Sequence, residues 1–115
     1  MRFLVDMRLT ESARPKTPED RAHFVKTVVF PTLTQCNKLA EEGKIVAGGP
    51  ASAQIRLILV IEAASALELD EMIERLPVWA LTETTVTPLT TFEDRRTAIL
   101  GLLESHSNEA SGRSK

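Results

Sequence analysis

Residues 54–77, QIRLILVIEAASALELDEMIERLP, carry the clearest strand of the chain and the helix that follows it. The apolar run within 54–62 predicts a strand. Ser65 precedes the next apolar stripe, and Glu68 lies three residues after Ser65. This pairing of serine and glutamate is typical of a helix N-terminus. Pro77 is expected to end this helix, because proline has no backbone N–H to donate.

A second strand is predicted at the N-terminus, where residues 2–9 alternate in polarity. Successive side chains of a strand point to opposite faces, so one face of this strand is wholly apolar. That face consists of Phe3, Val5, Met7 and Leu9. The other face mixes charged and apolar side chains, which are Arg2, Leu4, Asp6 and Arg8.

The remaining elements follow from caps, breakers and β-branched runs. A helix is predicted from Thr17–Pro18 to Glu42, with a kink at Pro31 and an end at Gly43. Short strands are predicted over 44–49 and 82–87, and Gly48-Gly49-Pro50 is expected to form a hairpin turn. A last helix is predicted over 92–104, followed by a disordered tail over 105–115.

The order strand-helix-strand-strand-helix-strand is typical of ferredoxin-like α+β domains. We therefore predict one domain over residues 1–91, with a four-stranded antiparallel sheet that carries both helices on one face. The other face is uncovered and partly apolar, so we expect the chain to form a homodimer or a higher homo-oligomer. The predicted helix 92–104 is expected to pack on the neighbouring subunit.

The two central strands should bring charged residues together on the uncovered face. In this topology the strands 2–9 and 54–62 are antiparallel neighbours, so the end of one meets the start of the other. Asp6, Arg8 and Arg56 are then expected at one end of the face, and Arg2 with Glu62 at the other. Between them lies a floor of Leu4, Ile58 and Val60, which could hold a small acidic ligand or pack on a second sheet.

Composition argues against several classes of function. The 14 Lys and Arg are scattered among 16 Asp and Glu, with a net charge of −2, which does not favour nucleic-acid binding. No apolar run reaches the length of a membrane span, and no signal peptide is predicted, so a cytoplasmic protein is expected. His23, His106 and the single Cys36 have no spacing suited to a metal or haem site, and no cofactor is predicted.

Three passages resemble known families. Arg75-Leu76-Pro77-Val78-Trp79 and Val86-Thr87-Pro88-Leu89 are similar to the C-terminal signature of muconolactone delta-isomerases. The passage 43–50, GKIVAGGP, resembles the YCII-like proteins, whose first-helix histidine is replaced here by Thr32. Both families belong to the dimeric α/β-barrel superfamily, so the resemblance implies that fold.

The favoured hypothesis is a cofactor-free isomerase that moves a proton on a small lactone or unsaturated acid. Asp6 is the candidate base if burial raises its pKa, and Glu62 is the reserve. Arg8 or Arg56 would hold the substrate's acid group or an enolate oxygen. Trp79 is assigned either to the mouth of the substrate cleft or to the subunit contact. The alternatives are a non-catalytic dimer that binds a metabolite or only stabilises an assembly, and a cofactor-free monooxygenase.

Overall fold

Four strands form one antiparallel sheet in the order β2-β3-β1-β4. The structure is a computed structural model that describes residues 1–113, with side chains described for residues 1–107. The strands are β1 (Arg2–Leu9), β2 (Ile45–Pro50), β3 (Arg56–Glu62) and β4 (Thr82–Leu89). The predicted ferredoxin-like α+β fold is confirmed.

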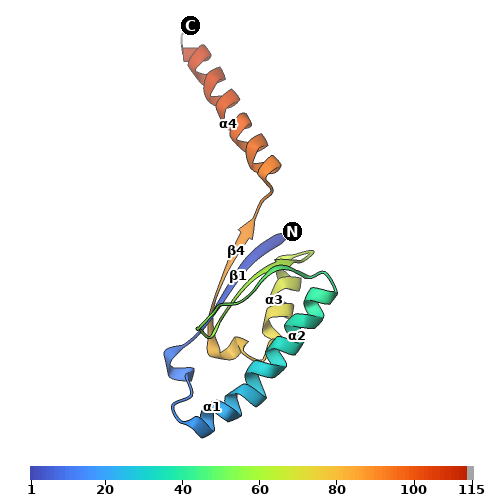
Figure 1. The fold of residues 1–115 in the computed structure, drawn as a ribbon. Helices are drawn as coiled ribbons and strands as arrows, with labels where there is room; N and C mark the ends of the chain where they lie inside the picture. The colour runs from blue at the N-terminus through green and yellow to red at the C-terminus, as the bar shows by residue number, and fades with distance from the viewer. Residues whose placement is uncertain (114–115) are drawn as a thin grey trace.

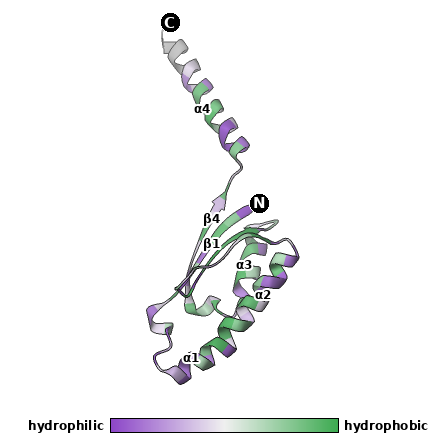
Figure 2. Cartoon of the chain, viewed as in Figure 1, coloured by the Kyte–Doolittle hydropathy of each residue, from purple (hydrophilic) through white to green (hydrophobic). Residues whose placement is uncertain are grey.

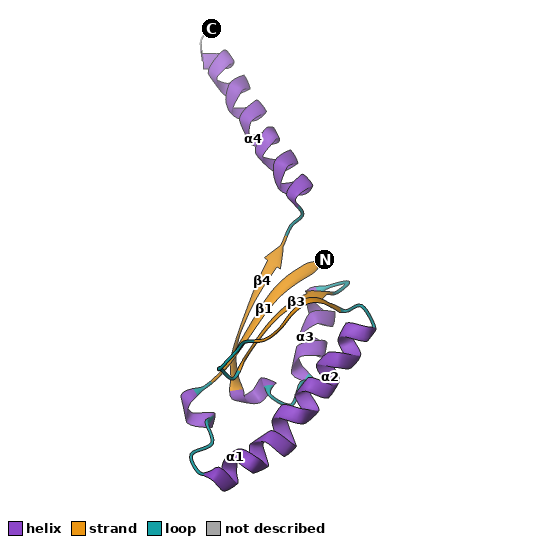
Figure 3. Ribbon diagram, in the orientation of Figure 1, coloured by secondary structure: helices purple, strands orange, loops and turns teal. Residues whose placement is uncertain are grey.

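The helices that follow β1 and β3 lie on one side of this sheet (Figure 1, Figure 3). They are α1 (Pro18–Phe24), α2 (Phe30–Glu41) and α3 (Ala66–Glu74). Thr17 caps α1 by accepting a hydrogen bond from the Asp20 amide at 3.0 Å, and Ser65 caps α3 by accepting one from the Glu68 amide at 3.1 Å. Both predicted helix starts are confirmed, because the side-chain oxygens replace missing helical acceptors.

The core lies between the sheet and these helices. The predicted apolar face of β1 is buried together with the side chains of β3 that point the same way, and Val5 and Met7 have no exposed surface. Leu69, Met72 and Ile73 of α3 and Leu39 of α2 pack in the same cluster. The remaining strand residues of the core are Phe3, Leu9, Leu57, Leu59 and Ile61. The opposite sheet face is therefore left for the charged residues of β1 and β3.

The long helix predicted over 18–42 is interrupted near Pro31. A π-helical turn, η2 (Val25–Val29), separates α1 from α2, and Pro31 lies in the first turn of α2. A proline ring inside a regular helix collides with the preceding turn and removes one hydrogen bond. The wider π turn accommodates that change, so the predicted kink takes the form of a local change in helix type.

The turn predicted at Gly48-Gly49-Pro50 is wrong, because these residues belong to β2. Gly48 has φ +96° and pairs with Leu59, and a Cβ there would collide with the backbone carbonyl of Ile58. Pro50 is tolerated because β2 is an edge strand, where a missing donor costs little. The connection to β3 lies over residues 51–55.

Three other boundaries differ from the predictions. β3 begins at Arg56, and β4 continues through Pro88 to Leu89. The last helix, α4 (Phe92–Arg113), extends through much of the predicted tail, and residues 114–115 lie outside the described part of the chain. Figure 2 shows apolar positions on α4, although this helix stands away from the sheet.

Candidate functional site

The uncovered face of β1 and β3 carries the predicted cluster of charges. The register pairs Leu4 with Val60, Asp6 with Ile58, and Arg8 with Arg56. Leu4, Ile58 and Val60 are only half-buried in the single chain, because no helix among the described residues covers them. The predicted apolar floor, with charges at both ends, is confirmed.

Asp6 and Arg56 form a bidentate ion pair at one end of this floor. Arg56 Nε donates to Asp6 Oδ1 at 2.9 Å, and Arg56 Nη2 donates to Asp6 Oδ2 at 2.6 Å. The pair is half-buried, with 26% of the Asp6 side chain and 30% of the Arg56 side chain exposed. This fork geometry fixes the orientation of the carboxylate as well as its charge.

The Asp6 pKa is lowered, so the condition attached to Asp6 as the candidate base, a pKa raised by burial, is not met. The hydrogen bond from Arg56 is the main cause, and the charges of Arg56 and Arg8 act in the same direction. Burial opposes the shift but does not reverse it. A guanidinium at hydrogen-bond distance stabilises the ionised form more than partial burial penalises it. Asp6 is consequently an ionised carboxylate at neutral pH.

Arg8 lies beside this pair and is exposed. Its Cα partners in the register are Arg56 on β3 and Glu83 on β4. Within the part of the chain that the structure describes, no carboxylate forms an ion pair with Arg8. Its guanidinium is therefore available to an acidic ligand.

A polar hollow of about 340 Å³, called here the arginine hollow, opens next to these residues. It is lined by Arg8, Leu9, Thr10, Glu11, Arg14, Gln54, Ile55, Arg56 and Glu83. Arg14 is paired with Glu11 at 3.1 Å, whereas Arg8 faces the hollow unpaired among the described residues. A carboxylate or enolate oxygen bound here would meet a planar donor group.

Glu62 lies at the other end of the floor, in a separate cluster. Its carboxylate accepts hydrogen bonds from the N-terminal amine and from Arg2 Nε, each at 3.1 Å. The hydrogen bond from the N-terminal amine is the main cause of a lowered Glu62 pKa. The charge of that amine and the hydrogen bond and charge of Arg2 act in the same direction. Four positions of β1 separate Arg2 from Asp6, which is about 13 Å along a strand. Asp6 and Glu62 therefore do not face the same small molecule within one chain.

Trp79 begins the short helix η3 (Trp79–Leu81) and is 39% exposed. It does not line the arginine hollow. Both assignments made for Trp79, the mouth of the substrate cleft and the contact with another subunit, stay predictions.

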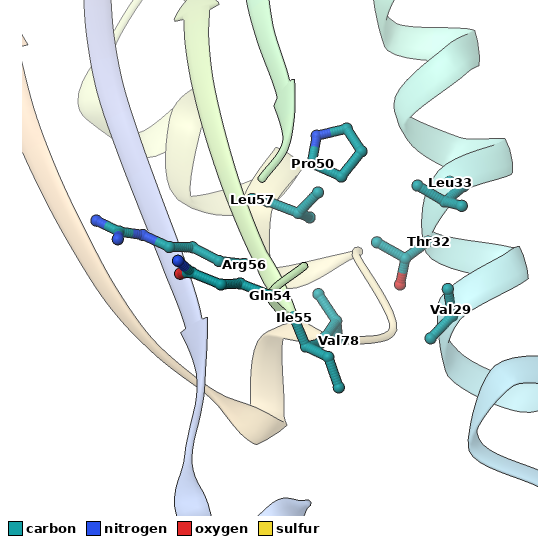
Figure 4. A pocket seen from close by; sticks show the side chains of 9 residues that line it. All are labelled: Val29, Thr32, Leu33, Pro50, Gln54, Ile55, Arg56, Leu57 and Val78. Carbon is teal, nitrogen blue, oxygen red and sulfur yellow. The ribbon is translucent and has the colours of Figure 1, made fainter. Parts of the chain in front are cut away.

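A second opening, the Thr32 cavity, lies on the helix side of the sheet and has a volume of about 160 Å³ (Figure 4). It is lined by Val29, Thr32, Leu33, Pro50, Gln54, Ile55, Arg56, Leu57 and Val78. Thr32 is 3% exposed, and its hydroxyl has no hydrogen-bond partner. Sequence reasoning missed this cavity, although a threonine on the apolar stripe beside Pro31 was a signal.

The remaining metal-ligating and nucleophilic side chains among the described residues form no second site. Among the described residues, no three His, Cys, Asp or Glu side chains are placed to hold one metal ion. Cys36 is half-buried in α2, and burial raises the pKa of its thiol. No helix within residues 1–113 has the length and apolar character needed to cross a membrane.

The fold and the sequence together define the class of protein. The family described as muconolactone delta-isomerase matches residues 1–95, and the chain belongs to this family. A search of curated proteins found no match. The predicted family resemblance is therefore confirmed over most of the chain, up to the first turn of α4.

One solved structure with the same fold is 5-chloro-2-hydroxyhydroquinone dehydrochlorinase from Burkholderia phenoliruptrix AC1100, in complex with 2,5-dihydroxybenzoquinone. It superposes with a TM-score of 0.58 at 22% sequence identity, and the match covers 82% of this chain and 98% of that one. This likeness supports the ferredoxin-like α+β fold of the single chain.

Proposed function

We propose that this protein is a cofactor-free enzyme that moves a proton on a small lactone or unsaturated acid. The observation that carries the proposal is the juxtaposition of the ionised Asp6 carboxylate with two guanidiniums, one of which, Arg8, is available to a ligand. Membership of an isomerase family gives the reaction class its support. The named activity of the structural neighbour, a dehydrochlorinase, also acts on a small ring.

Asp6 is proposed as the base and Arg8 as the group that binds the substrate's acid or carbonyl oxygen. Proton removal beside a carbonyl develops negative charge on oxygen, and a fixed guanidinium stabilises that charge. Arg56 orients Asp6 through its two hydrogen bonds. A carboxylate with a lowered pKa is a weak base, so the stabilisation of the developing oxygen charge has to supply much of the rate.

A non-catalytic small-molecule binding protein is the second candidate. The bidentate pair favours it, because Arg56 occupies both oxygens of Asp6. Removal of a proton by Asp6 then needs Arg56 to shift when a ligand enters. A binding protein needs no such shift, and Arg8 alone would retain an acidic ligand.

Proton exchange distinguishes the two candidates without knowledge of the product. A panel of small lactones and unsaturated acids is incubated with the protein in D2O, and deuterium incorporation beside the carbonyl is followed by NMR. The enzyme hypothesis predicts exchange with at least one ring size, lost in Asp6→Asn and kept in Glu74→Gln, which removes an exposed carboxylate on α3. Ligand binding without exchange would favour the binding protein.

A further inference from the structure

The helix α4 stands apart from the sheet and from α3 of its own chain (Figure 1). Thr91 caps it by accepting a hydrogen bond from the Asp94 amide at 3.0 Å, so it begins as a regular helix two residues after β4. Its large apolar side chains are exposed, and an isolated helix is marginally stable in water. The helix therefore needs a surface on which to pack.

The described part of α4 separates its basic and acidic side chains onto two faces. Residues three and four apart in a helix lie on the same face. One face therefore carries both arginines of residues 92–107 with most of the apolar side chains, and the acids Glu93, Asp94 and Glu104 lie away from it. This arginine face consists of Phe92, Arg95, Arg96, Ile99, Leu102 and Leu103. It fits a surface that is both apolar and acidic.

The two arginines are poorly placed for α4 itself. Among the residues that the structure describes, neither Arg95 nor Arg96 forms an ion pair. Both lie in the first two turns of the helix, where the helix dipole disfavours positive charge. An acidic surface opposite them would stabilise this placement.

The outer face of α3 is an acidic surface of this kind. Leu67, Asp70 and Glu71 lie three and four residues apart, so they share one face, and all three are exposed. Neither acid forms an ion pair within residues 1–107, and the last turn of α3 contains no basic residue. These three residues, called here the acidic face of α3, combine an apolar side chain with two negative charges.

The two faces match when the helices run antiparallel. With Ile99 of α4 against Leu67 of α3, the two arginines lie one turn before Ile99 and the two acids lie one turn after Leu67. The antiparallel arrangement also sets the two helix dipoles in opposite directions, which is favourable. The apolar side chains then cover each other, and the arginines meet the acids.

We propose that the arginine face of α4 docks on the acidic face of α3 in another copy of the chain. This contact lies on the helix side, so it is separate from the sheet face and from the chemistry proposed for Asp6 and Arg8. A dimer held through the sheet face therefore stays assembled when the acidic face of α3 is changed.

The connection between β4 and α4 is too short for this register within one chain. Leu89, at the end of β4, pairs with Arg2 beside Glu62, so α4 starts near the N-terminal end of α3. The antiparallel register needs Phe92 at the far end of α3, which is nine residues or about 14 Å long. The two residues between β4 and α4 bridge only about 10 Å.

Two other occupants fit the arginine face less well. Two arginine faces placed against each other would bring like charges together, because no acid within residues 92–107 lies on this face. Helices that lie on anionic membranes are rich in Lys and Arg. Residues 92–107 carry three acids against two arginines, which gives a net charge of −1 with neutral histidine.

Charge reversal on each face tests the proposal on the full chain. The α4 variant carries Arg95→Glu with Arg96→Glu, and the α3 variant carries Asp70→Arg with Glu71→Arg. Amide hydrogen exchange across residues 99–103 reports whether α4 is docked, because an undocked helix exchanges rapidly. Each variant alone sets like charges against each other, so this exchange is expected to be about tenfold faster than in the wild type.

Coexpression of the two variants, with a different affinity tag on each, separates a contact between copies from a contact within one chain. In the mixed assembly the reversed charges of one α4 face the reversed charges of the other chain's α3, and the second contact is native. Exchange across 99–103 is expected to return to the wild-type rate. Arg21→Glu, at an exposed position of α1, is the matched control and should leave this rate unchanged. Circular dichroism checks that each variant is folded.

Three outcomes would overturn the proposal. Unchanged exchange in both single variants would show that these charges do not hold α4. Recovery of slow exchange only when all four substitutions are in one chain would place the contact within that chain. Fast exchange in the wild type that slows only when phosphatidylglycerol vesicles are added would assign the arginine face to a membrane surface.

Discussion

Arg56 on β3 holds the carboxylate of Asp6 on β1 with two hydrogen bonds, at 2.9 and 2.6 Å, across the uncovered face of the sheet. The two residues are 50 positions apart in sequence. Their contact depends on the register that places Asp6 opposite Ile58 and Arg8 opposite Arg56. A slip of one residue would turn either side chain toward the core.

The ion pair should make folding stability sensitive to acid. A carboxylate whose pKa is lower in the folded state contributes stability above its unfolded pKa, and loses it as the pH falls through the folded value. For Asp6 this loss is expected below about pH 4. Urea unfolding at several pH values should show a steeper loss of stability in the wild type than in Asp6→Asn.

Glu62 should behave in the same direction, because its pKa is also lowered in the folded protein. Glu62→Gln is therefore a second test of the direction in which stability changes with pH, and it should lose less stability in acid than the wild type. Glu74→Gln is the control, because it removes an exposed carboxylate outside both clusters. If all variants lost stability in acid as steeply as the wild type, neither pair would be a source of that stability.

The uncovered sheet face predicts a homodimer. Leu4, Ile58 and Val60 form an apolar strip that no described helix covers. Ile58→Asp would place an unpaired charge in the subunit contact, so it should give a monomer in light scattering at micromolar concentration. Leu67→Asp is the matched control, because Leu67 is exposed on α3, on the helix side. A monomeric wild type would contradict the prediction.

The helix α4 predicts a second contact between copies. Phe92, Leu102 and Leu103 are exposed by 99%, 68% and 62%, and an isolated helix is marginally stable in water. We expect α4 to pack on the neighbouring subunit, which would bury these side chains. A chain ending at Thr91 should melt at a lower temperature and associate less strongly, by calorimetry and light scattering. An unchanged melting temperature and oligomeric state would show that α4 has no such role.

Much of the fold could be predicted from local patterns. The alternation in β1 identified its buried face, and the antiparallel neighbour placed Asp6 next to Arg56. The turn predicted at Gly48-Gly49-Pro50 was wrong, because glycine and proline are typical of turns. Their place in an edge strand depends on the sheet around them, which the local sequence does not show. The length of α4 was also missed, since small polar residues say little about a helix end.

The site was predicted less completely than the fold. The direction in which the Asp6 pKa shifts depends on a balance between burial and hydrogen bonding, and sequence patterns do not show this balance. The Thr32 cavity forms where α2, β3 and the loop before η3 meet, and no single segment contains it. Both features arise from tertiary packing.

The pH dependence of proton exchange tests the account's central claim, that Asp6 is an ionised base held by Arg56, most directly. With an exchanging lactone from the panel, the NMR rate in D2O should be level between about pH 5 and pH 8 and should fall only below about pH 4. That result would match the lowered Asp6 pKa. A rate that rises with a midpoint near pH 6 or 7, and persists in Asp6→Asn, would contradict the account and assign the base to another group.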